Sequence, residues 1–274
     1  MEAPERSPVW IIVMLTMILV ELAWRLGRGH GYDRRSAFAT LGLIAGNIPF
    51  AILNAVVLGS LFVAVSKLAP IHLPTRDWRT LLAAFLIFEF AYYWFHRASH
   101  RIRWLWATHA THHSSEQLTL LASFRLGWTN LFSAGWIFYV PLLLVGFDPR
   151  LIFGLLAFNL HYQFFLHTEA VGRLGPIEWL FNTPSHHRLH HAANDCYLDR
   201  NYGGVLIIFD RMFGTFTTDQ AGEAPRYGLA HRVATDNPLR LAFREWRYMF
   251  AEAFRATSPR AAARALIGPP ASEN

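Results

Sequence analysis

The chain has 274 residues and a single cysteine, Cys196. One cysteine cannot form a disulfide within the chain, and it cannot supply the several thiolates that a cysteine-based zinc site or an iron–sulfur cluster needs. The sequence therefore excludes these centres. If the protein binds a metal, other side chains have to hold it.

Charged residues are also scarce. They make up 16% of the chain, whereas hydrophobic residues make up 53%, which is too apolar for an ordinary soluble domain. The net charge of +6 could suit nucleic acid. However, the basic residues flank apolar runs, as they do in proteins that contact anionic lipid headgroups. We therefore expect a membrane protein and no nucleic-acid partner.

Several catalytic fingerprints are absent. The sequence has no His-Glu-x-x-His motif, since His167-Thr168-Glu169 lacks that spacing, and no Gly-x-Ser-x-Gly nucleophile elbow. It also lacks the Gly-x-Gly-x-x-Gly dinucleotide fingerprint, a flavin motif and a ferredoxin-like cysteine set. A hydrolase is disfavoured, and a redox reaction would have to take its electrons from outside the chain.

Five apolar runs predict helices that enter or cross a membrane, at residues 8–24, 38–68, 80–95, 131–147 and 151–166. Gly46, Asn47 and Pro49 interrupt the second run, which is compatible with one tilted span, one kinked span or a re-entrant pair. No cleavable signal peptide is expected, because the first six residues are acidic as well as basic. The predicted fold class is an all-α, polytopic membrane bundle with about four to five transmembrane helices.

Histidine is the abundant functional residue, and eleven of the fourteen histidines lie between residues 96 and 191. Eight of these form three groups with spacings of three and four residues, which place side chains on one helix face. The groups are His96 and His100, then His109, His112 and His113, then His187, His190 and His191. Each group is expected to point at one spot, and eight neutral imidazoles suit two metal ions rather than one. The isolated His30, His72 and His231 are expected to be structural.

The order of runs and histidines predicts where the site lies. The first two groups precede the hairpin of runs 131–147 and 151–166, and the third group follows it, so all three can meet at one membrane face. Twenty of the 25 Lys and Arg residues fall on that side if the second run crosses once. The positive-inside rule then makes the histidine face cytoplasmic.

The last hundred residues are more polar. Residues 176–181 and 184–192 are predicted to be short helices, and the apolar stretch 201–216 is expected to cover the metal site. Residues 239–254 predict an amphipathic helix that either lies in the headgroup plane or packs on the catalytic region. Residues 258–274 are expected to be loosely ordered. The predicted regions are 1–79 for the N-terminal membrane helices, 80–236 for the catalytic region, and 237–274 for the amphipathic helix and tail.

The histidine-rich ligand set indicates the kind of metal. Imidazole ligands suit iron for activating dioxygen, whereas zinc suits hydrolysis, whose other signatures are missing. A haem would use two axial histidines at most and leave six without a role. The sequence therefore favours an iron oxygenase whose apolar helices hold a lipid.

The pattern H-x3-H, H-x2-H-H, H-x2-H-H resembles the fatty acid hydroxylase and sterol desaturase superfamily, from about Glu89 to about Pro238. Residues 163–216 and the sequence YGLAH at 227–231 are similar to the alkylglycerol monooxygenase branch of that superfamily. The resemblance implies a pair of irons held at the cytoplasmic membrane face by the eight grouped histidines and by His167.

The resemblance also suggests roles for residues around the metals. Glu89, an ionisable residue inside an apolar run, is expected to orient a ligand histidine. Asn201 and Tyr202 are expected to position water, substrate or backbone. His186 is expected beside the ligands or as an alternate ligand, and His161 either lines the substrate pocket or packs.

The implied reaction is hydroxylation of a lipid C–H bond with O2 and electrons from an external reductant. In the alkylglycerol branch the reductant is tetrahydrobiopterin and the lipid is an ether lipid. The sequence is also compatible with a desaturase or hydroxylase acting on a sterol, carotenoid or aminolipid, and with a non-catalytic metal-binding membrane protein.

Overall fold

The computed structural model describes residues 9–230 and 232–270, and within these ranges the chain is helical, with two isolated β-bridges and no strand. The expected all-α fold is confirmed. The α-helices are α1 Val9–Gly27, α2 Arg34–Ser66, α3 Trp78–Arg101, α4 Arg103–His109, α5 Asn130–Ser133, α6 Val140–Val145, α7 Pro149–Phe164, α8 Pro184–His190, α9 Ile208–Phe213, α10 Pro238–Arg255 and α11 Pro259–Ile267. The short 3₁₀ helices are η1 His112–Ser114, η2 Leu120–Phe124, η3 Gly135–Tyr139 and η4 Gly175–Trp179.

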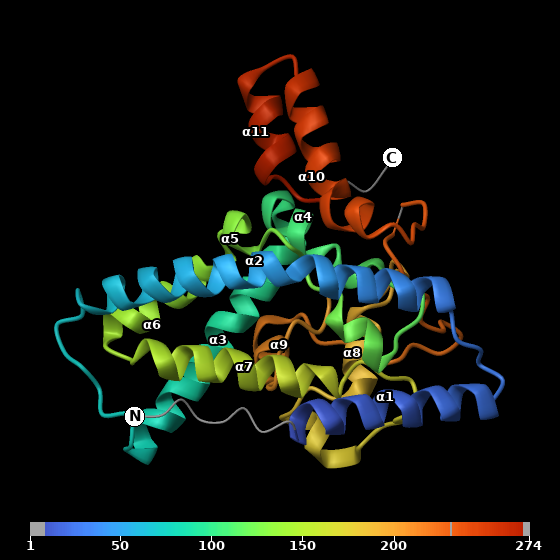
Figure 1. Cartoon of the computed structure of the whole chain (residues 1–274), viewed down its shortest axis with the longest axis horizontal. Coiled ribbons are helices and arrows are strands. Elements are labelled where there is room, and N and C mark those ends of the chain that lie inside the picture. Colours follow the sequence, from blue (N-terminus) through green and yellow to red (C-terminus); the bar gives the residue numbers. More distant parts are fainter. Residues whose placement is uncertain (1–8, 231, 271–274) are drawn as a thin grey trace.

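Two helices, α1 and α2, are long and apolar enough to cross a membrane. Few of their side chains are buried in the protein, as expected for surfaces that lipid covers. The second apolar run forms one continuous helix (Figure 1), so the re-entrant interpretation is wrong. Asp33 caps this helix by accepting hydrogen bonds from the backbone N–H groups of Arg35 and Ser36.

The expected span over residues 131–147 is not formed as one helix. The chain forms α5, η3 and α6 there instead. Ala134, with a positive φ of 60°, separates α5 from η3, and Gly146, with a φ of 111°, ends α6. The next run, α7, has 16 residues, or about 24 Å of helix, which is shorter than the ~30 Å hydrocarbon core of a membrane. Two helices in the described chain are therefore both long enough and apolar enough to cross a membrane, fewer than the four to five expected.

A hydrophobic core joins α2, α3, α6 and α7 and fixes the orientation of the helices that carry the site. Phe88 of α3 stacks on Tyr139 at a ring distance of 5.1 Å, and Phe62 of α2 stacks on Phe153 of α7 at 5.1 Å. Leu142 and Leu143 of α6 are buried in the same core. The packing holds α3 against α7, which it crosses at an angle (Figure 1). The histidine-rich segments lie at and after the C-terminal ends of these two helices.

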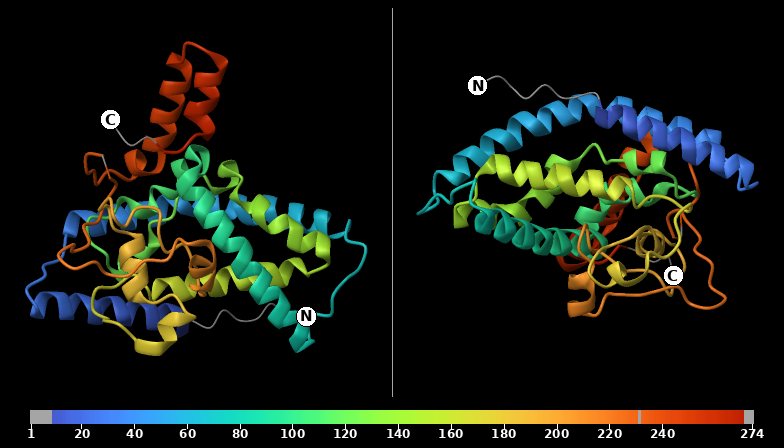
Figure 2. Two further views of the ribbon diagram at one scale, coloured as in Figure 1. Left: turned by 180° about the vertical axis from the view of Figure 1, so that it is seen from behind. Right: turned by 90° about the horizontal axis from the view of Figure 1, so that it is seen from below.

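The C-terminal region differs in part from expectation. The amphipathic helix predicted at 239–254 is α10, and Asn237 caps it through the N–H of Arg240. The prediction of loose order over 258–274 is wrong for α11. Ser258 caps the first turn of this helix, and Ala265 within it is buried. Residues 271–274 of that range, and His231 further upstream, lie outside the described residues. α10 and α11 form a hairpin that projects away from α2 (Figures 1 and 2).

Candidate metal centre

The histidines reach the centre from four short stretches of chain. The last two turns of α3 carry His96 and His100, and α4 with η1 carries His109, His112 and His113. His167 follows α7 within three residues, and α8 with the residue after it carries His187, His190 and His191. The predicted short helix 184–192 is thus confirmed as α8, which begins at Pro184, a residue well suited to the first helical turn.

Five of these side chains form one group, which we call the five-histidine group: His96, His100, His109, His113 and His190. One ring nitrogen from each lies within 4.8 Å of those of all the others. The Nε2 atom of His109 is 3.0 Å from Nε2 of His96 and 3.1 Å from the Nε2 atoms of His100 and His113. Nitrogens that converge in this way match the ligand arrangement around one metal ion.

Four more form a second group, the four-histidine group: His112, His167, His187 and His191. Here Nε2 of His167 is 3.2 Å from Nε2 of both His112 and His187, and Nε2 of His187 is 3.1 Å from that of His191. All nine histidines singled out from the sequence as metal ligands lie in one of the two groups, and the two groups share no residue.

The two groups are neighbours. The rings of His113 and His191, one from each group, stack at 4.3 Å with an angle of 21° between their planes. His109 and His112 lie 5.5 Å apart by ring centroid. The expectation that each sequence group points at one spot is therefore wrong for the second and third groups. Because successive helical residues point about 100° apart, each H-x2-H-H segment divides its ligands between the two sites.

Backbone carbonyls orient several of the rings. The Nδ1–H groups of His96 and His167 donate to the carbonyls of Tyr202 and Gln163, each at 2.7 Å, and that of His190 donates to the carbonyl of Arg200 at 2.9 Å. With the proton on Nδ1, the Nε2 lone pair is free to bind a metal. The Nε2 atom of His190 is buried and has no hydrogen-bond partner among the described residues. Burying a nitrogen without a partner costs free energy, and a bound metal ion would provide the missing partner. The donor set therefore fits a metal.

The electrostatics of the centre keep the rings neutral. Burial lowers the pKa of His109 to about 3, with the nearby His190 adding to the effect. Burial likewise lowers the pKa of His167 and of His190 to about 4 in each case, against the hydrogen bonds of their Nδ1 atoms. Neutral imidazole is the form that coordinates metals, so the site is ready to bind a cation at neutral pH.

Glu89 forms no direct hydrogen bond to a histidine within the described chain. Its Oε1 accepts from Nδ2 of Asn159 at 2.6 Å, and its Oε2 accepts from the backbone N–H groups of Val205 and Leu206 at 2.8 and 3.1 Å. Asn159 in turn accepts from Nε2 of Gln163, whose carbonyl holds His167. The expected link between Glu89 and a ligand is therefore indirect, through α7 on one side and the 202–206 loop on the other.

Asn201 and Tyr202 differ in how close they come to the centre. Asn201 adopts a φ of 56°, and its side chain binds the carbonyls of His186 and Thr217 and the N–H of Thr217, so its contacts are to backbone. Tyr202 is buried and places its ring edge-on to that of His100, with 5.2 Å between the ring centres. Tyr202 thus lies beside the five-histidine group, whereas Asn201 fixes the loop that carries it.

Sequence reasoning missed other buried polar residues that support the centre. Asp210 accepts from the N–H groups of Tyr202 and Gly203 at 2.7 Å each, and burial raises its pKa to about 6. Arg125 is 1% exposed and donates to Ser114, beside the second histidine segment, and to Ser36 of α2. Asp210 is an acid within an apolar stretch, the same signal that identified Glu89. Arg125 gives no comparable signal in the sequence.

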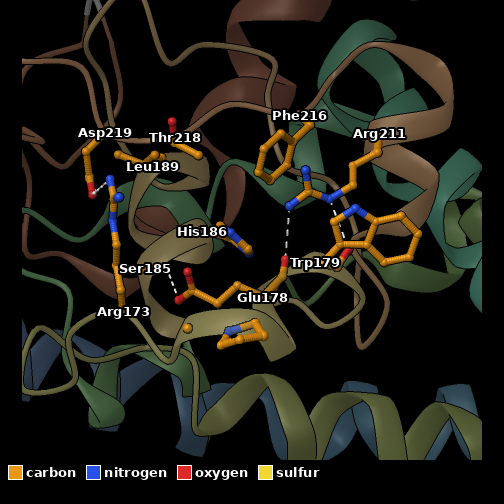
Figure 3. A pocket seen from close by; sticks show the side chains of 12 residues that line it. Arg173, Glu178, Trp179, Ser185, His186, Leu189, Arg211, Phe216, Thr218 and Asp219 are labelled. Carbon is orange, nitrogen blue, oxygen red and sulfur yellow. Dashed lines mark hydrogen bonds and ion pairs between the residues drawn. The ribbon is translucent and has the colours of Figure 1, made fainter.

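His161 and His186 lie outside both groups. His161 is on an exposed surface of α7, edge-on to Trp10, so it does not line the centre. His186 is buried on α8 but faces the other way, with its ring edge-on to Phe216. His186 lines a separate pocket of about 300 Å³. In Figure 3 its ring lies between Glu178 and Arg211.

This pocket is lined by charged side chains and also by apolar ones, among them Trp179, Leu189 and Phe216. The guanidinium of Arg211 lies 3.6 Å from the ring centre of Phe216 and donates to the carbonyls of Glu178 and Trp179 (Figure 3). Arg173 pairs with Asp219 at 3.2 Å along one edge of the pocket (Figure 3). None of the nine grouped histidines lines this pocket, so the metal centre and the pocket occupy different sides of α8.

Comparison with known proteins gives the family. Residues 81–215 match the model of the fatty acid hydroxylase family. The chain is 38% identical over 239 residues to an alkylglycerol monooxygenase of Homo sapiens, covering 86% of this chain and 52% of that protein. It is 45% identical over 181 residues to the alkylglycerol monooxygenase of Danio rerio, covering 66% and 40%.

A more distant relative is an ornithine lipid hydroxylase of Rhizobium tropici, 30% identical over 149 residues, which cover 54% of this chain and 45% of that protein. No solved structure matches the chain. The chain spans about half the length of the curated relatives it matches. The family match lies within the expected catalytic region, and it includes all nine histidines of the two groups. The chain belongs, through residues 81–215, to the fatty acid hydroxylase family.

Proposed function

We propose that the protein is a membrane-bound di-iron monooxygenase that hydroxylates a lipid C–H bond with O2 and two electrons from an external donor. The observation that carries the proposal is the pair of adjacent histidine groups, with five and four converging nitrogens. Two neighbouring ions that act on one oxygen species need such a paired ligand set.

The chemistry of the donor set supports iron. The nine ligands are neutral nitrogens, and neither candidate group includes a carboxylate or thiolate. Imidazole suits iron in oxygen chemistry. When bound, the irons would activate O2, so that a C–H bond, O2, two electrons and two protons give an alcohol and water.

The residues of this chain would position the reaction. The carbonyls of Tyr202, Gln163 and Arg200 hold three ligand rings by their Nδ1–H groups. Glu89 and Asp210 hold the 202–206 loop through four backbone N–H groups, and this loop carries the Tyr202 carbonyl. The ligand side chains themselves are largely buried, which limits the entry of water.

An ether lipid is the proposed substrate. The relatives with 37–45% identity are named alkylglycerol monooxygenases, and the matches to two of them cover 86% of this chain. Hydroxylation of the carbon next to an ether oxygen gives a hemiacetal, which breaks down to an aldehyde and the glycerol alcohol. The external donor would be tetrahydrobiopterin, and the histidine face would be cytoplasmic, as the distribution of Lys and Arg indicates.

An aminolipid hydroxylase is the second candidate. The similarity to an ornithine lipid hydroxylase favours an aminolipid over a sterol or carotenoid, although over a shorter part of the chain than the similarity to the alkylglycerol monooxygenases. Both candidates use the same centre, so only the lipid distinguishes them. A desaturase would differ in its product, which loses two hydrogens and gains no oxygen.

The experiment uses the full chain in lipid vesicles with iron, ¹⁸O2 and tetrahydrobiopterin. Alkylglycerol, ornithine lipid and a sterol are supplied in separate reactions, and the products are analysed by mass. We expect fatty aldehyde carrying ¹⁸O from alkylglycerol, and no such product from the variant His112→Ala. His161→Ala is the matched control, because His161 is exposed and outside both groups, and it should retain full activity.

Different results would redirect the proposal. Oxygen incorporated only into the ornithine lipid would support the second candidate and overturn the ether-lipid assignment. Products that have lost two hydrogens would indicate a desaturase. Full activity in the His112→Ala variant would show that the proposed centre is not the site of oxidation.

A further inference from the structure

The C-terminal hairpin of α10 and α11 has an exposed apolar surface that the catalytic centre does not explain. α10 buries one face, which includes Leu241, Trp246 and Met249, against α2, α4 and α11. A different face carries a row of apolar side chains at intervals of four, seven and four residues, which we call the apolar stripe. The stripe consists of Leu239, Phe243, Phe250 and Phe254, and every one of these side chains is exposed.

The spacing makes the stripe continuous. Residues four and seven apart lie on the same side of a helix, so these four side chains share one line along α10. Phe254, at its end, is 87% exposed. Trp104 of α4 extends the apolar surface, since its ring lies edge-on to that of Phe250 with 5.8 Å between the ring centres. Exposed apolar residues in a continuous row mark a surface that another phase or molecule covers.

Basic residues border this stripe. Arg240 and Arg247 are seven residues apart and lie along one edge of it, both exposed. Residues 238–267 contain six arginines and two glutamates. Both glutamates are already paired, Glu245 with Arg232 and Glu252 with Arg103. The free charge beside the apolar stripe is therefore positive, which is complementary to anionic lipid headgroups.

The position of the hairpin on α2 agrees with a membrane surface. Leu241 and Ala242 pack on Ala39 and Leu43 of α2, and a Cβ added at Gly42 would lie 2.5 Å from the ring of Pro238. On one side of this contact α2 continues from residue 43 to residue 66, about 36 Å of apolar helix. That length is enough for the ~30 Å hydrocarbon core. The hairpin projects sideways from α2 (Figure 1).

We propose that the apolar stripe of α10 lies in the interface of the membrane, with Leu239, Phe243, Phe250 and Phe254 among the acyl chains and Arg240 and Arg247 at the headgroups. The occupant of the surface is thus an anionic lipid bilayer. Because α10 also packs on α4, which ends at His109, this contact would fix the distance between the headgroup plane and the metal centre.

The test uses nitroxide labels on the full chain in vesicles of phosphatidylcholine that also contain phosphatidylglycerol as the anionic lipid. In a Cys196→Ser background, a label is placed at Phe254→Cys and, as the matched control, at the neighbouring exposed position Arg255→Cys. We expect the 254 label to collide more often with oxygen and less often with a water-soluble nickel chelate than the 255 label. Replacing Arg240 and Arg247 by Gln should lower the oxygen-to-nickel ratio at 254.

Two results would overturn the proposal. Equal, water-like collision rates at 254 and 255 would mean that the stripe faces solvent. A 254 label that is shielded from both reagents, or broadened by a second label, would mean that a protein surface covers the stripe. Because Phe254 and Arg255 are both exposed, neither label should disturb the fold, and unchanged iron content in both labelled proteins would verify that.

Discussion

Glu89 offers the sharpest mutational test of how the centre is supported. Its carboxylate accepts three hydrogen bonds, from Asn159 of α7 and from the backbone N–H groups of Val205 and Leu206. It is 1% exposed, so water cannot replace a lost partner. The substitution Glu89→Ala would leave three buried donors without acceptors.

The expected loss in free energy of unfolding follows from the number of buried donors that lose their acceptor. Each buried donor left without an acceptor costs about 1–3 kcal/mol, so Glu89→Ala should cost roughly 3–9 kcal/mol. Since whole domains are stable by about 5–15 kcal/mol, this variant should fold poorly. Glu89→Gln replaces one acceptor oxygen by a donor and should cost about 1–3 kcal/mol, which leaves the fold intact.

The informative variant is therefore Glu89→Gln. Asn159 and Gln163 would lose their fixed positions, and the carbonyls that orient His167 and His96 would shift. Loss of such support typically weakens metal binding by about 10–100-fold, and we expect a loss of that order in iron affinity. The assay is iron retained by the purified variant during titration with a chelator.

The control is Tyr139→Phe, at a neighbouring buried position. The Tyr139 hydroxyl is buried and has no hydrogen-bond partner among the described residues, so its removal should leave iron affinity unchanged. If Glu89→Gln bound iron as tightly as the parent protein, the link from Glu89 to the ligand histidines would be refuted.

Gly204, Arg125 and the buried histidines give three further predictions. Gly204→Ala should reproduce the iron loss of Glu89→Gln, because a Cβ there would lie 2.2 Å from Nδ2 of Asn159; wild-type affinity in the chelator titration would contradict this. Arg125→Gln should lower the midpoint of thermal unfolding, since it removes buried hydrogen bonds of Arg125 worth about 1 kcal/mol or more each, and an unchanged midpoint would argue against that role. The metal-free protein should lose stability as pH falls from about 6.5 towards 4, because burial holds the folded-state pKa of His167 and His190 at about 4, below the unfolded value. The protein is fully stable above about pH 6.5, and each of these two groups accounts for about 3 kcal/mol of the free energy of unfolding lost at low pH. An unfolding midpoint that does not change with pH would contradict the burial argument.

The sequence predicts which residues form the centre better than it predicts how the histidines divide between the two groups. The spacing of His109, His112 and His113 identifies them as candidate ligands, and the structure brings all three to the centre. The same local spacing cannot show that His112 joins His187 and His191 while His109 and His113 join His96. That division depends on how α4, η1 and α8 are packed, which is a tertiary property.

The membrane helices are predicted less well. Hydropathy identifies α1 and α2, but it cannot show that the run over 131–147 bends at Ala134 and ends at Gly146. Alanine rarely adopts a positive φ, so the sequence gives no warning of the break. The prediction of loose order is wrong over α11, because the order of this helix depends on tertiary contacts that composition does not reveal. These contacts are the packing against α10 and the hydrogen bond from the N–H of Arg103 to the Gly268 carbonyl.

The central claim is that each histidine group holds one iron, and metal analysis of the purified full chain tests it most directly. The parent protein and the control His161→Ala should each contain about two irons per chain. His112→Ala and His190→Ala each remove a ligand from a different group, so each should lose about one iron, with the rest held by the intact group. One iron or none in iron-supplemented parent protein, or full iron content in both variants, would contradict the account.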